Sequence, residues 1–252
     1  MSQQPPYQTY PLGDFALQTG THIPQAHLAY KTYGDPQNPT IIYPTWFSGL
    51  IADNEWLISP TQTLDPTRYF IIVPALFGNS QSSSPSNRPD LRPFPHVSFY
   101  DNVRAQHALV TQHLGIQHVR AVLGWSMGAA QSFQWATQYP GFMDLVVPFY
   151  PENMLVMLHT WQAGDCSNQE PYQGDFAAAM RGIKAKALVL PCKTDLYFPP
   201  EDSEIEVNHM RDGIGELKVF PSIWGHWAGG PGQSAEDVKW LDERLREFFE
   251  KN

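Results

Sequence analysis

The sequence predicts an α/β protein with a mostly parallel central sheet and helices on both of its faces. Short apolar runs recur along the chain, each ended by proline or glycine, without the polar alternation of a half-exposed strand. Such runs are typical of strands that are covered on both sides. Helical segments fit between the later runs, and alternation of strand and helix indicates parallel strands. A chain of 252 residues can bury one full core, so a single domain over residues 1–252 is expected.

The predicted elements follow in a simple order. Two extended runs, 15–17 and 27–33, come first, and buried strands are expected at 40–43, 69–73, 119–123, 145–147, 187–190 and 217–220. Helices are expected at 103–114, 128–139, 177–182 and 236–250. No helix separates the first two or three runs, so that edge of the sheet should be antiparallel. Segments 82–95 and 161–174 are predicted as surface loops, with a mobile rim of a site as the alternative.

The charge of the chain excludes some classes of partner. It has 16 Lys plus Arg against 25 Asp plus Glu, a net charge of −9, and no basic stripe that could bind a nucleic-acid backbone. The start of the chain lacks the basic and apolar segments of a signal peptide, and no apolar run approaches membrane-spanning length. A soluble cytoplasmic protein without membrane contact is therefore expected.

The two cysteines, Cys166 and Cys192, are too few for a disulfide framework and are expected to be free thiols. Cys192, at the end of an apolar strand, should be buried and slow to react, whereas Cys166, in a polar loop, should react faster. The sequence has neither a metal-ligand spacing nor a glycine-rich phosphate loop. No metal or cofactor is therefore expected.

The strongest chemical motif is Gly124-Trp125-Ser126-Met127-Gly128, a G-x-S-x-G segment between a predicted strand and a predicted helix. In this context the motif is typical of the α/β-hydrolase fold, where the serine sits on a sharp turn and flanking glycines let strand and helix approach closely. The turn aims the serine hydroxyl outward and the first helix amides at the same point. Ser126 is therefore the predicted nucleophile, and a glycine-rich packing turn is the alternative.

A serine nucleophile needs a histidine as its base, which in this fold lies late in the chain. Three histidines follow Ser126, and His159 and His209 lie in helix-like contexts. His226 lies just beyond the last predicted strand and before the terminal helix. His226 is the predicted base.

The histidine in turn needs an orienting acid, and the order along the chain is serine, acid, histidine. Asp195 follows the strand at 187–190 and is the favoured acid. Glu152, after the preceding strand, is the alternative, and Asp202 is expected to cap a helix.

An oxyanion hole needs a second amide besides that of Met127. The loop after the 40–43 strand can supply it, with Phe47 as the first choice and Trp46 as the second. Aromatic residues adjacent to the catalytic positions are predicted to form an open rim that binds substrate: Trp46, Phe47, Trp125, Trp224 and Trp227.

These residues resemble the homoserine O-acetyltransferase branch of the α/β-hydrolases. The likeness covers residues from about 10 to the end, and its motifs lie at 28–34, 124–128 with Gln131, 135–136, 139–140, 195–200 and 225–226. The run Asp-Leu-Tyr-Phe-Pro-Pro at 195–200 and the Trp-Ser-Met turn at 125–127 are fairly specific for this branch. The resemblance implies Ser126, Asp195 and His226 as a catalytic triad that forms an acyl-enzyme.

The chain departs from that branch in three places. Family members carry a long helical lid, whereas only about 40 residues separate Val147 from Ala187 here. The lid is thus predicted to be shortened or deleted, with 150–176 as a residual cap. Trp227 stands where the acetyltransferases have an acidic residue after the histidine, and only Arg181 is available as a carboxylate-binding arginine.

The departures favour hydrolysis of a small ester or thioester, as in a carboxylesterase, because transfer to an alcohol requires that water be kept out. The alternative is O-acetyl transfer from acetyl-CoA to an alcohol such as homoserine. A second alternative is a non-catalytic binding module on a hydrolase core. An open apolar rim would also permit a homodimer.

Overall fold

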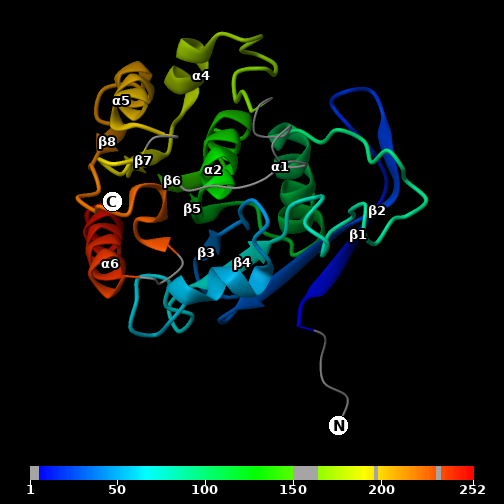
Figure 1. Ribbon diagram of the computed structural model, residues 1–252, viewed down its shortest axis with the longest axis horizontal. Helices are drawn as coiled ribbons and strands as arrows, with labels where there is room; N and C mark the ends of the chain where they lie inside the picture. The colour runs from blue at the N-terminus through cyan, green and yellow to red at the C-terminus, as the bar shows by residue number, and fades with distance from the viewer. Residues whose placement is uncertain (1–5, 150–163, 196–197, 231–233) are drawn as a thin grey trace.

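The computed structural model describes residues 6–149, 164–195, 198–230 and 234–252, which form an eight-stranded sheet with flanking helices (Figure 1). Its strands are β1 (Gln8–Ala16), β2 (His22–Tyr33), β3 (Thr40–Ile42), β4 (Phe70–Pro74), β5 (Val119–Trp125), β6 (Met143–Phe149), β7 (Lys186–Val189) and β8 (Gly215–Leu217). Their order across the sheet is β1-β2-β4-β3-β5-β6-β7-β8. The predicted α/β-hydrolase fold with a mostly parallel sheet is confirmed.

The antiparallel edge is narrower than the sequence suggested. β1 pairs antiparallel with β2, and β2 pairs antiparallel with β4. The run at 40–43 was a possible third member, but β3 lies between β4 and β5 and is parallel to both. The connection from β3 to β4 contains the helical turn η1 (Ile51–Leu57) and is long enough for the crossover that parallel neighbours need.

The helices are α1 (Phe99–Ala108), α2 (Met127–Gln138), α4 (Phe176–Gly182), α5 (Pro200–His209) and α6 (Ala235–Lys251). Helical turns η2 (Leu109–His113) and η3 (Gly225–Trp227) complete the described set. The ends of α2, α4 and α6 agree with the predicted ones within one residue. α1 begins four residues before the predicted start, and α5 was not among the predicted helices.

Capping explains where α1 and α5 begin. Ser98 precedes α1, and its hydroxyl accepts a hydrogen bond from the amide of Asp101, whose carboxylate accepts one from the amide of Ser98. α5 instead begins behind Pro199 with Pro200 at its first position, where a missing N–H is harmless. Asp202 lies in the first turn and does not cap the helix, so the prediction for Asp202 is wrong.

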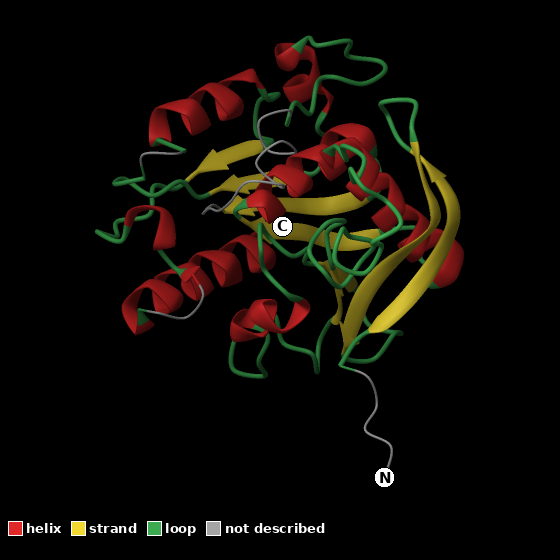
Figure 2. Ribbon diagram, turned by 45° about the vertical axis from the view of Figure 1, so that its right-hand side comes forward, coloured by secondary structure: helices red, strands yellow, loops and turns green. Residues whose placement is uncertain are grey.

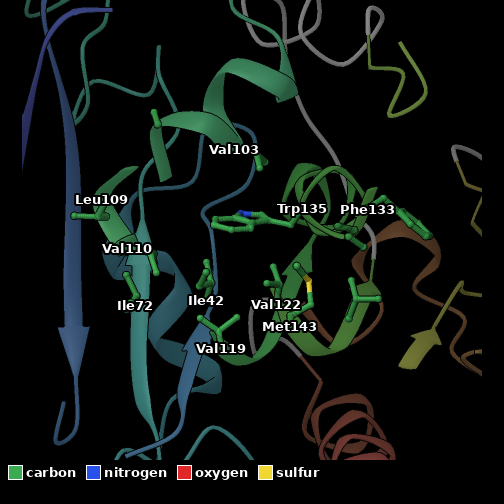
Figure 3. Close-up of a cluster of buried hydrophobic side chains, with 14 of the residues drawn as sticks. Ile42, Ile72, Val103, Leu109, Val110, Val119, Val122, Phe133, Trp135 and Met143 are labelled. Carbon is green, nitrogen blue, oxygen red and sulfur yellow. The ribbon is translucent and has the colours of Figure 1, made fainter. Parts of the chain in front are cut away.

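Both faces of the sheet are covered, which explains the continuous apolar runs. Ile42 and Val122 belong to the buried cluster that contains Trp135 of α2 (Figure 3). Their neighbours Ile41 and Leu123 point the other way and belong to a second cluster with the apolar stripe of α6. Figure 2 shows the sheet between these helical layers.

The predicted surface loop at 82–95 is buried at its start, while residues 85–95 form exposed and half-buried turns as expected. Ser82 and Ser83 are completely buried. The Ser82 hydroxyl accepts from the amide of Ala29 at 2.9 Å, and the Ser83 hydroxyl accepts from the amide of His27 at 2.9 Å. The hydroxyl groups thus pair with amides of β2, which ties this segment to the sheet.

The second predicted loop is partly described. Gln169 Nε2 donates to Thr137 Oγ1 at 3.1 Å, and the hydroxyl of Tyr172 donates to the carbonyl of Thr137 at 3.1 Å. Residues 164–175 therefore form turns packed on α2, while 150–163 of the predicted residual cap lie outside the described residues. No helix in the described ranges is long and apolar enough to cross a bilayer.

Candidate active site

Ser126 occupies the turn between β5 and α2 with φ 60° and ψ −128°. A positive φ at a non-glycine residue is strained and persists only where the surroundings hold it. A side chain at Gly124 would collide with the carbonyl of Gly128, and a Cβ at Gly128 would lie 3.0 Å from the carbonyl oxygen of Pro44. Both glycines are therefore required for the close approach of strand, helix and the loop after β3.

The start of α2 and the loop after β3 pack against each other. The amide of Met127 is at the first position of α2, where an N–H has no partner within the helix. The Met127 side chain packs in one buried cluster with Phe47, Leu76 and Phe99. The loop after β3 is thus packed against the nucleophile turn, beside the positive end of the α2 dipole.

A buried chain of side-chain hydrogen bonds joins that loop to α2. Trp135 Nε1 donates to Gln106 Oε1 at 2.8 Å, and Gln106 Nε2 donates to Gln131 Oε1 at 2.6 Å. Gln131 Nε2 in turn donates to the carbonyls of Thr45 at 2.9 Å and Met127 at 3.1 Å. In the sequence, Gln131 was noted only as part of the resemblance to the acetyltransferase branch. In the structure its side chain is buried on α2 and links that helix to Gln106 and to the loop after β3.

Asp195 and His226 lie together although 31 positions separate them. Asp195 Oδ2 is 2.6 Å from His226 Nδ1, and both side chains are buried. The other oxygen, Oδ1, accepts a hydrogen bond from the amide of Phe198 at 3.2 Å. The Phe198 ring stacks on the imidazole with centroids 5.6 Å apart. A proton held on Nδ1 by the carboxylate leaves Nε2 to exchange protons with a substrate or nucleophile.

The loop 222–229, here called the histidine loop, is fastened from two sides. Thr194 Oγ1 accepts from the amide of Gly225 at 2.9 Å and donates to the carbonyl of Ser222 at 3.1 Å. Asp237 Oδ2 accepts from the hydroxyl of Ser222 at 2.8 Å and the amide of Gly229 at 3.2 Å. Gly225 has φ 55°, and a Cβ there would lie 3.0 Å from the Thr194 carbonyl oxygen, so glycine is required.

Trp125 joins the segments that carry these groups. Its ring meets Trp46 of the loop after β3 edge to face, with centroids 4.5 Å apart, and lies 5.9 Å from the ring of Trp227. Gly230 packs so closely on the Trp125 ring that no Cβ would fit. The nucleophile turn, the loop after β3 and the histidine loop therefore meet at Trp125.

The predicted aromatic rim is only partly present. Trp125, Trp46 and Phe47 are buried, with 1%, 6% and 4% of their surface exposed, so the prediction that they form an open rim is wrong. Their rings support neighbouring loops and are closed to solvent. Trp224 and Trp227, on either side of the histidine, are 59% and 48% exposed and can contact a ligand at the surface.

A cavity of about 180 Å³ borders this region. Its lining comes from α1, α2, α4, α5 and the segments before α4 and α5: Phe99, Ala130, Phe133, Gln134, Gly164, Asp165, Cys166, Phe176, Phe198 and Glu206. Phe198 also stacks on His226, and Phe99 shares a cluster with Met127. The cavity therefore adjoins both His226 and the start of α2.

Glu206 is one of three polar lining residues, with Gln134 and Asp165, that sequence reasoning missed. Its Oε2 is buried and has no hydrogen-bond partner within the described part of the chain. Burial, with a smaller contribution from nearby Asp202, raises the pKa of Glu206 to about 8. Nothing in the sequence of α5 distinguishes Glu206 from its exposed neighbours Glu201 and Glu204.

Cys166 also lines the cavity. It is half-buried, and burial together with the charges of Asp165 and Glu206 raises the pKa of its thiol to about 12. A thiol of that pKa is hardly ionised at neutral pH, so the structure predicts slow reaction of Cys166 in place of the fast reaction expected from the sequence. Cys192 is buried, as predicted.

The remaining candidates are placed as follows. Glu152 and His159 lie outside the described residues. His209 lies at the end of α5, where its ring nitrogen Nδ1 is 2.7 Å from the Ile205 carbonyl oxygen. Arg181, near the end of α4, is exposed and is not among the described residues that line the cavity.

Residues 56–179 match a family model described as the alpha/beta hydrolase fold, and they include the nucleophile turn. The protein has the α/β-hydrolase fold. The crystal structure of an acetylester hydrolase from Corynebacterium glutamicum resembles this hydrolase with a TM-score of 0.88 and 26% identity, over 97% of this chain and 96% of that one. An ethyl acetate hydrolase of Pseudomonas veronii is 28% identical over 339 aligned positions, which cover 97% of this hydrolase and 95% of the relative.

The predicted resemblance to homoserine O-acetyltransferases is confirmed. The enzyme of Thermobifida fusca is 33% identical over 153 residues, which cover 49% of this hydrolase and 38% of the relative. The alignment with the P. veronii enzyme has 339 positions against 252 residues here, so at least 87 of its positions have no counterpart in this hydrolase. This difference agrees with a reduced lid.

Proposed function

We propose that this hydrolase cleaves short esters through a covalent acyl-enzyme, with Ser126 as nucleophile, His226 as base and Asp195 as orienting acid. Nε2 of His226 takes the serine proton while Oγ attacks the ester carbonyl carbon. Asp195, 2.6 Å from Nδ1, stabilises the imidazolium that forms. His226 then protonates the departing alkoxide, and a water molecule deprotonated by His226 releases the acid from Ser126.

The observation that carries this proposal is the strained turn at Ser126. Its φ of 60° at the start of α2 is the backbone conformation of a serine nucleophile in this fold, in which the helix amides are aimed at the same point as the hydroxyl. The amide of Met127 would stabilise the oxyanion of the tetrahedral intermediate, together with that of Phe47 or Trp46. Such donors act on charge that develops only during the reaction, so they lower the barrier and do not merely bind substrate.

We propose hydrolysis, with water as the acyl acceptor, as the main reaction. The ethyl acetate hydrolase of P. veronii and the acetylester hydrolase of C. glutamicum, both named as ester hydrolases, resemble this chain over nearly its full length. The exposed Trp224 and Trp227 beside the histidine leave that side of the site open to water. Transfer to an alcohol would instead require that water be excluded.

A serine-directed fluorophosphonate and the variant Ser126→Ala test the proposal. The probe should label Ser126, and S126A should lose turnover of propyl acetate by about 10⁴–10⁶-fold while keeping its fold. Ser86→Ala, an exposed serine on another segment, is the matched control. Full activity of S126A would refute the assignment, and absence of labelling and turnover would support a non-catalytic binding module.

O-Acyl transfer is the second candidate, because half of the chain is 33% identical to a homoserine O-acetyltransferase. Product partition distinguishes the two reactions: one acetyl donor is supplied with millimolar homoserine or another alcohol, and free acetate is measured against new ester. Excess acetate supports hydrolysis. Excess new ester would assign the enzyme to acyl transfer.

We also propose that the protein works in the cytoplasm. Its cysteines, Cys166 and Cys192, are free, as is usual for proteins of reducing compartments. Cell fractionation with an antibody against the chain tests this location, and recovery outside the cytoplasmic fraction would refute it.

A further inference from the structure

We infer that the cavity between α2, α4 and α5 holds the alcohol portion of the ester, and that Glu206 selects alcohols with a second, uncharged hydrogen-bonding group such as a hydroxyl. The inference rests on the proposed ester hydrolysis and adds a substrate class to it.

The position of the cavity relative to the histidine indicates which half of the ester it holds. Phe198 lines the cavity and stacks on His226 with ring centroids 5.6 Å apart. His226 is the group that protonates the departing alkoxide in the proposed reaction. The alcohol portion must therefore lie on the side of the imidazole, where the wall formed by Phe198 begins.

The cavity is large enough for the alcohol portion of a small ester. Its volume is about 180 Å³, well above the roughly 10–15 Å³ that one water molecule needs on the same kind of measure. An alcohol with two to four carbons and one further polar atom therefore fits. The aromatic lining, Phe99, Phe133 and Phe176, suits the methylene groups of such a chain.

Glu206 provides polar recognition in this mostly aromatic cavity, which Gln134 and Asp165 also line. A buried polar atom without a hydrogen bond is unfavourable, and Oε2 of Glu206 is such an atom within the described residues. With a pKa of about 8, Glu206 is mostly protonated at neutral pH, so it can both donate and accept a hydrogen bond. A hydroxyl group is the complementary partner because it also does both.

A carboxylate on the alcohol portion should be rejected. The cavity also contains Asp165, and Asp202 lies close enough to affect Glu206. No lysine or arginine is present among the described lining residues, so no cation is available to pair with an anion. An amino-acid carboxylate would therefore be unpaired in a cavity of like charge.

A pair of substrates of equal size tests the inference on the full-length protein. The ratio of kcat/KM for 2-hydroxyethyl acetate to that for propyl acetate should be roughly three to ten, the value expected for one uncharged hydrogen bond. Glu206→Leu should lower this ratio to about one. Glu206→Gln should keep part of it, because an amide also donates and accepts. Glu204→Leu, on the exposed side of α5, should keep the wild-type ratio.

Acetoxyacetate, the anionic analogue, provides a second readout that does not require E206L to fold. In the wild type, the ratio of kcat/KM for acetoxyacetate to that for propyl acetate should fall as pH rises from 7 to 9, because Glu206 ionises and repels the carboxylate of the substrate. In E206Q this ratio should change much less. The other titratable groups around the cavity are Asp165, Cys166, Asp202 and His226, and all remain in both proteins. The ratio of two substrates cancels the titration of His226.

Three results would overturn the inference. The first is a wild-type ratio near one for 2-hydroxyethyl acetate, and the second is an equal ratio in E206L and wild type. The third is a Glu206-dependent preference for ethyl 3-hydroxypropanoate over ethyl butanoate, combined with no preference for 2-hydroxyethyl acetate over propyl acetate. That result would place the acyl portion of the ester in the cavity. The variant S126A distinguishes failure of the proposed function from failure of this inference. If S126A hydrolyses propyl acetate as fast as the wild type, the proposal of ester hydrolysis at Ser126 is wrong.

Discussion

Gln131 Nε2 donates a 2.9 Å hydrogen bond to the carbonyl oxygen of Thr45, which ties α2, the helix that follows Ser126, to the loop after β3. Both residues are completely buried. Because this bond links two segments far apart in sequence, it determines how closely the loop after β3 approaches the start of α2. Backbone donors of an oxyanion hole must be placed to within a fraction of an ångström, so the loop position bears directly on turnover.

We predict that Gln131→Met lowers kcat by about 10- to 100-fold with a smaller change in KM. The substitution also leaves the Thr45 carbonyl and Gln106 without their buried partner, which should lower the free energy of unfolding by about 1–3 kcal/mol. Steady-state kinetics and urea unfolding measure both effects. Gln138→Met, at the end of the same helix, is the control; a Q131M enzyme with normal kcat would show that the bond does not position the loop.

Asp195→Asn should lower kcat by about 10⁴-fold, because the amide can hold the imidazole in the wrong tautomer. Glu152→Gln, the alternative acid proposed from sequence, should have far less effect. Stopped-flow or steady-state hydrolysis of an activated acetate ester measures the two variants side by side. The opposite ranking would move the orienting acid to the segment after β6.

Asp237→Ala should loosen the histidine loop without touching the candidate catalytic groups. The Asp237 carboxylate accepts hydrogen bonds from Ser222 and Gly229, so its loss leaves two partly buried donors unpaired. A decrease of about 1–3 kcal/mol in unfolding free energy is expected, with reduced kcat. Glu236→Ala removes the exposed neighbouring carboxylate and should change neither quantity; similar losses in both variants would contradict a role specific to Asp237.

Stability should decline with pH because of Glu206. Its carboxyl has a pKa of about 8 in the folded protein against 4.5 ordinarily. Between these values the unfolded chain loses the proton while the folded protein keeps it, so the stabilisation present below pH 4.5 is lost as pH rises to about 8. Glu206→Gln removes this titration.

The unfolding free energy of E206Q minus that of the wild type should therefore increase from pH 5 to pH 8. Urea titrations at three pH values in this range measure it, with Glu204→Gln as the exposed control. A difference that is independent of pH would show that the Glu206 pKa is not raised.

Cys166 should react slowly with a thiol reagent in the native state. Burial and two nearby carboxylates raise its pKa to about 12, so the thiolate population at pH 8 is very small. The variant Cys192→Ser isolates this thiol, and the rate with Ellman's reagent is compared before and after denaturation without reductant. Rapid native-state reaction of Cys166 would contradict the burial of its sulfur.

Local sequence determined the order of the elements and the chemistry of the nucleophile turn. Apolar runs and helical periodicity act over a few residues, so β5, α2 and α6 could be predicted nearly to their ends. The glycines around Ser126 are required by a turn of five residues, and their spacing is visible without a fold. The order serine, acid, histidine likewise follows from where strands end along the chain.

Tertiary structure decided which side chains are accessible and which distant groups meet. Trp125 was expected at an open rim, but Trp46 of the loop after β3 and Trp227 and Gly230 near the histidine enclose it, and these two segments are far from Trp125 in sequence.

Ser82 was predicted to lie in a surface loop, but its hydroxyl is buried and accepts a hydrogen bond from the amide of Ala29 on β2. Glu206 resembles every other glutamate of α5 in sequence, and only the packing of α2, α4 and α5 around one cavity buries its carboxyl group. Burial and pKa depend on neighbours distant in sequence, which no local pattern encodes; the three-dimensional packing alone determined them.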